Sequence, residues 1–383
     1  MNQTETAVRG TPSVHRWARL RPACLAGARD CWERRVRVFP NNLIHPRHKV
    51  AGIFTPPLLR STQNNSIASA GRDGENDREL KTTVKYEGPR ELKANELFTA
   101  VFTFTLGQPI QPGGRILLAT RHVSDMSDPQ VDDPACENYV TITRPEGICW
   151  KLGRIEDGKR HPWNRGIEFE LAEGTVKAGE TITIILGDKS KGCPGYRSQS
   201  FVETSFHFRA AVFPGGKTDW EIMPEDYLPA IRITGNRCVA VKASVLRPTE
   251  QKSKRTICLK PEDTYGNVAG DVPGEVIVLD GNKPVGNVVL EPSRTAKLDT
   301  GITNGPAWRT ITVTSRDGAV WAKSNPFGPS PVSGHNLYWG EIHCQSGLCD
   351  GTNSPKELYE YARNAAGLDF ASVTSHDFEL TAA

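Results

Sequence analysis

The most constraining feature of this chain is a series of short strand-like segments that begins near residue 82 and continues through most of the remaining sequence. These segments alternate polar residues with β-branched or aromatic ones, the period-two pattern of a strand with one buried face. Glycine and proline separate them, and the 383-residue chain holds 35 Gly and 27 Pro, above the usual share of roughly 12%. The pattern predicts a mainly β protein with many tight turns.

The strand-like segments fall into two groups, which predict two consecutive β-sandwich domains. The first group lies within 82–235 and comprises residues 97–105, 115–120, 139–143, 167–171, 181–186 and 201–213. The second lies within 236–332 and comprises residues 238–246, 255–259, 275–279, 285–290 and 308–314. Short strands at this spacing, without a long amphipathic helix between them, are typical of sandwiches. The second group has about the length of an Ig-like domain.

The first 81 residues have a different composition. Within 1–60 there are ten Arg but only three acidic residues, Glu5, Asp30 and Glu33, and six prolines interrupt any periodicity. Residues 61–79 are polar and rich in Gly, Asn and Ser, as linkers are. We expect residues 1–81 to be a disordered or extraneous extension with a linker. An organellar transit peptide or a nucleic-acid-binding arm is the alternative.

The overall charge excludes several classes of partner. The 47 Lys and Arg nearly balance the 44 Asp and Glu, so no strong field exists to hold nucleic acid or an anionic membrane. No run approaches the 18 apolar residues of a spanning helix, and no signal-peptide pattern is present. The nine cysteines are scattered without a C-x-x-C pair. We expect a cytoplasmic protein with free thiols, without nucleic-acid or membrane partners.

Residues 333–383 carry the pattern of one β-α-β unit. Residues 337–346 read as a strand, and a helix follows in which Ser354 is the N-cap, Pro355 the first helical residue and Glu357 the capping-box acid. Gly367 ends this helix, and residues 368–374 read as a second strand. Such a connection implies that the two strands are parallel.

Polar side chains gather where these two strands end. His343 and Gln345 close the first strand, His376 and Asp377 follow the second, and Asp350 lies on the loop between the first strand and the helix. Because parallel strands end on the same side, these side chains are expected close together. Imidazoles with a carboxylate suit zinc, manganese or iron, so we predict a divalent metal site. The alternative is a polar network without a metal.

The same segment resembles a known family. Tyr338-Trp-Gly-Glu-Ile-His-Cys-Gln-Ser346, Tyr361-Ala-Arg363, Gly367-Leu-Asp-Phe370 and Ser375-His-Asp377 are similar to the opening of a PHP-type metal-dependent hydrolase domain. The closer resemblance is to the domain-of-unknown-function family 3604, which joins β-rich regions to such a domain and is also similar in outline from about residue 85. The resemblance implies a distorted β/α-barrel whose di- or trinuclear metal centre cleaves phosphoesters.

The resemblance also implies roles for individual residues. His343 corresponds to the first His of the His-x-His motif, and Gln345 stands where the second His is expected. Asp350 corresponds to the acid of a Ser-Asp-Gly motif, and His376 to the His of a Thr-Asp-His motif, in which Ser375 replaces the Asp. Gln is a weak, neutral ligand and Ser375 removes a carboxylate that would orient His376, so the resemblance implies a divergent site.

Only 47 residues run from Leu337 to Ala383, whereas a β/α-barrel needs about 200 to 250. We therefore expect the chain to be the N-terminal portion of a hydrolase acting on a small-molecule or phosphoester substrate. The chain as given should be inactive, because it contains only one unit of a truncated barrel. Uncovered strand edges favour self-association, unless the unit packs on the second sandwich. The alternative is a tandem β-sandwich binding or structural module whose C-terminal unit is vestigial.

Overall fold

The computed structural model describes residues 37–40, 81–143, 146–153, 162–216, 219–224, 226–248, 254–329 and 335–376. From residue 38 onward these belong to one compact unit. Strands in several sheets predominate, which confirms the prediction of a mainly β chain. Of the predicted extension only β1 (Arg37–Pro40) and residue 81 are described, and the rest lies outside the described residues. No helix in the described part is long and apolar enough to cross a membrane.

Two larger sheets form most of the first β region, which we define as residues 81–235. Their strand orders are β2-β5-β10-β7 and β14-β13-β6-β9-β8, and smaller sheets join β12-β15-β3 and β11-β4. The elements are β2 (Thr83–Glu87), β3 (Glu91–Lys93), β4 (Leu97–Phe98), β5 (Ala100–Thr105), β6 (Arg115–Thr120), β7 (Val140–Ile142), β8 (Cys149–Gly153), β9 (Arg165–Glu173), β10 (Thr181–Leu186), η3 (Lys189–Lys191), β11 (Tyr196–Arg197), β12 (Glu203–Phe206), β13 (Arg209–Phe213), β14 (Glu221–Ile222) and β15 (Ile231–Thr234).

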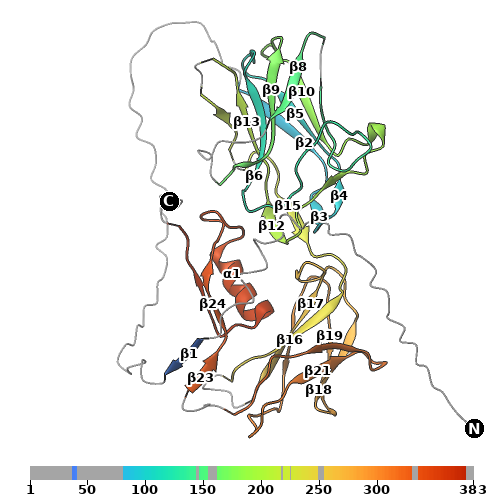
Figure 1. Ribbon diagram of the computed structural model, residues 1–383, viewed down its shortest axis with the longest axis vertical. Coiled ribbons are helices and arrows are strands. Elements are labelled where there is room, and N and C mark those ends of the chain that lie inside the picture. The colour runs from blue at the N-terminus through green and yellow to red at the C-terminus, as the bar shows by residue number, and fades with distance from the viewer. Residues whose placement is uncertain are drawn as a thin grey trace, which may run out of the picture. The chain divides into compact units, whose positions relative to one another are not determined.

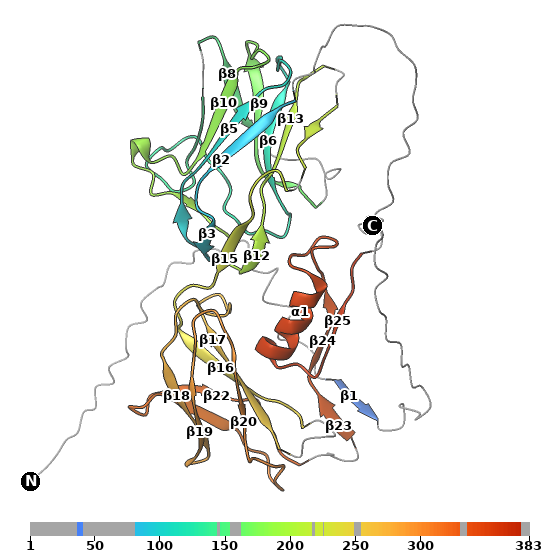
Figure 2. The same ribbon diagram turned by 180° about the vertical axis from the view of Figure 1, so that it is seen from behind.

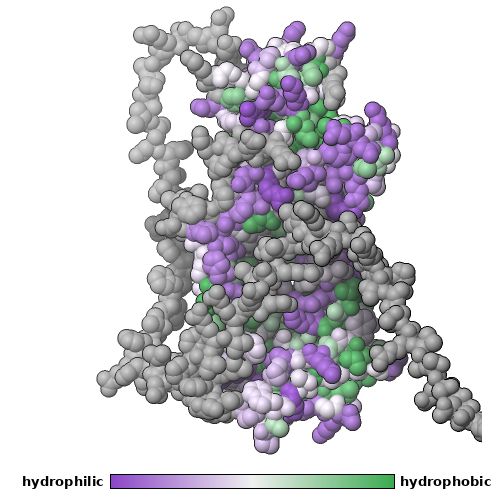
Figure 3. Space-filling model, in the orientation of Figure 1, coloured by the Kyte–Doolittle hydropathy of each residue, from purple (hydrophilic) through white to green (hydrophobic). Residues whose placement is uncertain are grey.

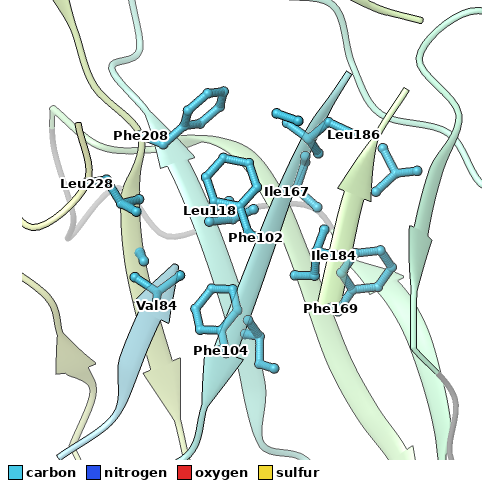
Figure 4. Packing of buried hydrophobic residues seen from close by; sticks show 14 of the residues in the cluster. Val84, Phe102, Phe104, Leu118, Ile167, Phe169, Ile184, Leu186, Phe208 and Leu228 are labelled. Atoms are coloured by element: carbon cyan, nitrogen blue, oxygen red, sulfur yellow. The ribbon is translucent and has the colours of Figure 1, made fainter. Parts of the chain in front are cut away.

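Alternation along the strands builds the core of this region. Ala100, Phe102 and Phe104 of β5 are fully buried, while the residues between them are half-buried. In the antiparallel register Phe102 lies opposite Ile184 of β10. Figure 4 shows these side chains meeting others that come from β6 and β9 of the second large sheet. On the face that Figure 3 displays, hydrophilic residues predominate at the surface of this β region. The two large sheets therefore share one hydrophobic core.

The second β region, residues 236–329, repeats this arrangement with fewer strands. Its sheets have the orders β16-β17-β20 and β19-β18-β21-β22, and all strand neighbours are antiparallel. Fully buried Ile257 of one sheet and Val276 of the other belong to the same core. The strands are β16 (Ala240–Val245), β17 (Thr256–Glu262), β18 (Glu275–Asp280), β19 (Lys283–Val289), β20 (Ala296–Asp299), β21 (Ile311–Thr314) and β22 (Val320–Lys323).

The C-terminal unit, residues 335–376, contains the predicted β-α-β connection. β23 (His335–Tyr338) pairs with β1, and β24 (Gly340–Cys344) runs parallel to β25 (Phe370–Val373). Between these parallel strands, α1 (Pro355–Tyr361) continues into the π-helical turn η4 (Ala362–Ala366). Figure 1 shows α1 together with β24 and β23, and Figure 2, from behind, shows α1 beside β25. The predicted capping box is present, and Gly367 has the left-handed φ of 69° expected of a helix-ending glycine.

Three predicted strands are divided in the structure. The segment 97–105 is split into β4, which pairs with β11, and β5, which pairs with β2 and β10. The segment 201–213 is split into β12, which pairs with β15, and β13, which pairs with β6. A register shift between Glu203 and Phe206 marks the irregularity before the break. Likewise 337–346 is divided between β23 and β24 at Trp339. In all three places a continuous strand-like pattern conceals a change of strand partner.

The C-terminal unit packs against the second β region, which was one of the two expected arrangements. The ammonium of Lys260 donates to the hydroxyl of Tyr361 over 3.0 Å, and the Cys258 thiol donates to the Asn364 carbonyl over 2.6 Å. A Cβ on Gly367 would come within 2.8 Å of the Ser244 side chain, so the absence of a side chain at Gly367 permits this close approach.

The Glu357 carboxylate of the C-terminal unit also contacts the first β region. Glu357 Oε2 accepts hydrogen bonds from Ser354 N and Oγ at 2.8 and 2.7 Å, which completes the capping box. Glu357 Oε1 accepts a hydrogen bond from Thr204 Oγ1 of β12 at 2.7 Å. These hydrogen bonds, that of the Ser354 backbone first, lower the pKa of Glu357.

Candidate functional site

The candidate site lies where β24 and β25 end, as the sequence predicts for parallel strands. Asp350 lies on the loop after β24, and its Oδ2 is 3.8 Å from Nε2 of His376, three residues beyond β25. The Asp350 side chain is 16% exposed and the His376 side chain 43%. The structure thus brings two of the predicted site residues together at the edge where a ligand is expected.

The other predicted residues have different immediate partners. The exposed ring of His343 lies with Nδ1 3.2 Å from the hydroxyl of Thr374, at the end of the neighbouring strand. Gln345 accepts a hydrogen bond from the buried Cys349 thiol at 3.0 Å. Asp377 lies outside the described residues. His343 therefore lies near the expected strand end, while Gln345 is engaged with the residue that precedes Asp350.

A residue of the first β region joins this cluster and was missed by the sequence reasoning. His122, in the turn after β6, has Nε2 3.6 Å from Asp350 Oδ2, while its backbone N–H donates to the Pro162 carbonyl at 2.8 Å. Nothing in the local pattern could have revealed this contact, because 228 positions separate the two residues and only the docked fold joins them.

The neighbouring Arg121 holds the loop that carries Asp350. Its guanidinium donates to the carbonyl of Gly347 at 3.1 Å and to that of Cys349, and it lies 5.6 Å from the ring centre of Trp163. Charge-assisted hydrogen bonds to backbone carbonyls are among the stronger ones in proteins. Arg121 therefore fixes the backbone on both sides of Leu348, next to the candidate site.

The donor chemistry of the cluster fits a divalent cation, but the cluster is incomplete. Asp350 Oδ1 is buried and receives no hydrogen bond from the described residues. Two ligand atoms on a tetrahedral zinc lie about 3.4 Å apart, close to the 3.8 Å between Asp350 and His376. Within the described ranges, however, no three His, Cys, Asp or Glu side chains form a metal-binding group. A cation held by this pair would need a further ligand to turn toward it.

No protein-family model matches the chain, and no curated protein sequence is significantly similar to it.

Proposed function

We propose that residues 333–383 are the opening unit of a PHP-like, metal-dependent hydrolase of the phosphoesterase type. In this proposal the two β regions are Ig-like sandwiches that precede a β/α-barrel in the parent protein. The motif resemblance over 338–377 supports it, as does the parallel pairing of β24 with β25 around a capped helix. The substrate would be a small-molecule phosphoester, and a cytoplasmic location is part of the proposal. The described cysteines are free thiols, which is consistent with a reducing compartment.

The observation that carries the proposal is the approach of His376 to Asp350 at the strand ends, 3.8 Å apart. Asp350 and His376 would hold the cation, with His343, Gln345 or Asp377 as further ligands. A bound divalent cation lowers the pKa of a coordinated water and polarises a phosphoryl oxygen. The orphaned Asp350 Oδ1 is an acceptor that a cation would satisfy.

Metal binding by the full chain tests this proposal. The protein is stripped with a chelator, titrated with Zn²⁺ or Mn²⁺ in a calorimeter, and analysed for bound metal. We expect one equivalent to bind, and Asp350→Asn and His376→Ala each to weaken binding by tenfold or more. Asp226→Asn, which alters an exposed carboxylate of the first β region, is the matched control and should bind as the wild type does. A folded wild type that takes up no stoichiometric metal would count against the proposal.

The second candidate is a binding or structural module in which the C-terminal unit has no chemistry. Its support is that this unit is anchored to both β regions, through Arg121 and Thr204 on one side and Lys260 on the other. The same titration separates the two candidates. If the folded chain binds no metal and Asp350→Asn leaves its stability unchanged, the module becomes the better description.

A further inference from the structure

A cavity of about 100 Å³ lies between the first β region and the loop that carries Asp350. Arg121, Trp163, Ser205 and His207 line it from the β region, and Asn353 lines it from the C-terminal unit. This volume is several times the roughly 30 Å³ that one water occupies in the liquid. The cavity therefore has room for a small polyatomic ligand, and its wall is mainly polar.

Positive charge lies at and next to one wall of the cavity: Arg121 and Trp163 line it, and Arg209 lies beside Trp163 without lining the cavity itself. The guanidiniums of Arg121 and Arg209 each lie 5.6 Å from the ring centre of Trp163. Among the described residues, the buried Nε of Arg209 has no hydrogen-bond acceptor. Two guanidinium groups against one aromatic ring raise the local potential, and a buried cation favours an anion nearby.

His207 and Ser205 add hydrogen-bonding groups next to this charge. His207 Nε2 lies 2.9 Å from the Ser205 hydroxyl, so the other ring nitrogen, Nδ1, takes no part in this contact. That Nδ1 is buried and makes no hydrogen bond to the described residues. Burying a polar atom without a partner is unfavourable, so a ligand with oxygen atoms in this cavity would remove the penalty.

Glu203, the acidic residue in the cavity wall, does not cancel the positive charge of the guanidiniums. Glu203 is 6% exposed, and its carboxylate already accepts a hydrogen bond from Gln199 Nε2 at 2.9 Å. Burial raises the pKa of Glu203, which disfavours its charged form. The guanidiniums carry their charge at all relevant pH values. The cavity is thus better matched to an anion than to a cation.

We propose that this cavity binds a small oxyanion of the phosphate type, with Arg121 supplying charge and His207 and Ser205 supplying hydrogen bonds. This ligand site is separate from the Asp350–His376 pair and does not rest on the hydrolase proposal. The same chemistry is offered by free inorganic phosphate and by the phosphate group of a monoester. The experiment treats these two sources separately.

Calorimetric titration of the full chain in the presence of a chelator tests the proposal, with inorganic phosphate and glycerol phosphate as separate ligands. We expect saturable binding, weakened about tenfold or more in His207→Ala. Arg121→Lys, which keeps the charge but loses the guanidinium fork, should also bind more weakly. The chelator removes metal ions, so that binding through a cation at the Asp350–His376 pair does not contribute. The matched control is Arg90→Ala, which removes a guanidinium that lies over Tyr86 in the first β region.

The two ligand arms identify the source. Tighter binding of the monoester would assign the cavity to a phosphorylated metabolite or substrate, and tighter binding of phosphate would assign it to the free ion. A folded wild type that binds neither ligand saturably would overturn the proposal. So would binding that is unchanged in both His207→Ala and Arg121→Lys, because the ions would then lie elsewhere on the surface. Thermal unfolding of each variant shows whether it is folded.

Discussion

The contact between Lys260 and Tyr361 permits a quantitative test of how the C-terminal unit is held. The Lys260 side chain is 7% exposed, and its ammonium lies 2.5 Å from Glu262, 3.0 Å from the Tyr361 hydroxyl and 3.1 Å from the Gly266 carbonyl. An ammonium has three donors, and each has a partner here. Tyr361→Phe would leave one donor of a buried cation without an acceptor, while the ring 5.4 Å away stays in place.

Hydrogen bonds to charged groups contribute about 1.5–3 kcal/mol. We therefore expect Tyr361→Phe to lower the free energy of unfolding by about 1.5–3 kcal/mol at pH 7. Urea unfolding followed by fluorescence measures this difference. Tyr227→Phe removes an exposed hydroxyl of the first β region and is the control, expected to stay within about 0.5 kcal/mol of the wild type.

The pH dependence gives an independent check of the same contact. Burial lowers the pKa of Lys260, but Tyr361 and Glu262 outweigh it, so the pKa is raised above 10.5. When folding raises the pKa of a lysine, the charged lysine contributes its full stabilisation at pH values below its pKa in the unfolded state. This stabilisation is lost as the pH rises through its pKa in the folded state. The difference between wild type and Tyr361→Phe should stay constant from pH 7 to about 9 and shrink above 10.5. Equal stability of Tyr361→Phe and Tyr227→Phe at pH 7 would refute the reasoning.

Three further predictions concern single side chains and are measured by urea unfolding. Ser354→Ala removes the acceptor for Glu357 N and should cost about 1 kcal/mol, whereas an equal stability would show that the cap contributes nothing. Phe102→Ala should cost about 3–5 kcal/mol because it empties a fully buried site, against less than about 0.5 kcal/mol for the exposed Val289→Ala. Burial raises the pKa of Glu203, so its ionisation begins to destabilise the fold as the pH rises through the unfolded pKa, and the loss is complete above the folded pKa. Glu203→Gln should therefore stabilise the fold at pH 8 but not at pH 4. A gain at both pH values would contradict that reading.

Local patterns predicted several strands with their exact bounds. The predicted segment 181–186 coincides with β10, in which every second residue is buried. The predicted segment 115–120 coincides with β6, an apolar run that is buried on both faces. The capping box and Gly367 likewise located both ends of the helix, since their chemistry is local. The pattern could not reveal which strands pair. The parallel pairing of β15 with β3 joins segments about 140 residues apart and depends on the fold as a whole.

The candidate site shows the same division between local and global information. The rule for parallel strands predicted that Asp350 and His376 would approach each other, because it fixes the side on which strands end. That rule does not determine side-chain rotamers, so it could not show that His343 would lie beside Thr374 or that Gln345 would engage Cys349. It also could not reveal His122, which lies in the turn after β6, a strand of another sheet.

The carboxylate shared between Ser354 and Thr204 makes helix formation and docking mutually dependent. A helical segment of this length is marginal in water on its own, so the hydroxyl from β12 helps to sustain its first turn. A change that breaks the hydrogen bond from Thr204 of β12 should therefore accelerate amide exchange at the start of α1. It should also increase the mobility of the adjoining loop around Asp350. Conversely, an ion captured by Asp350 should slow exchange in β12, so that a distant strand would report occupancy of the site.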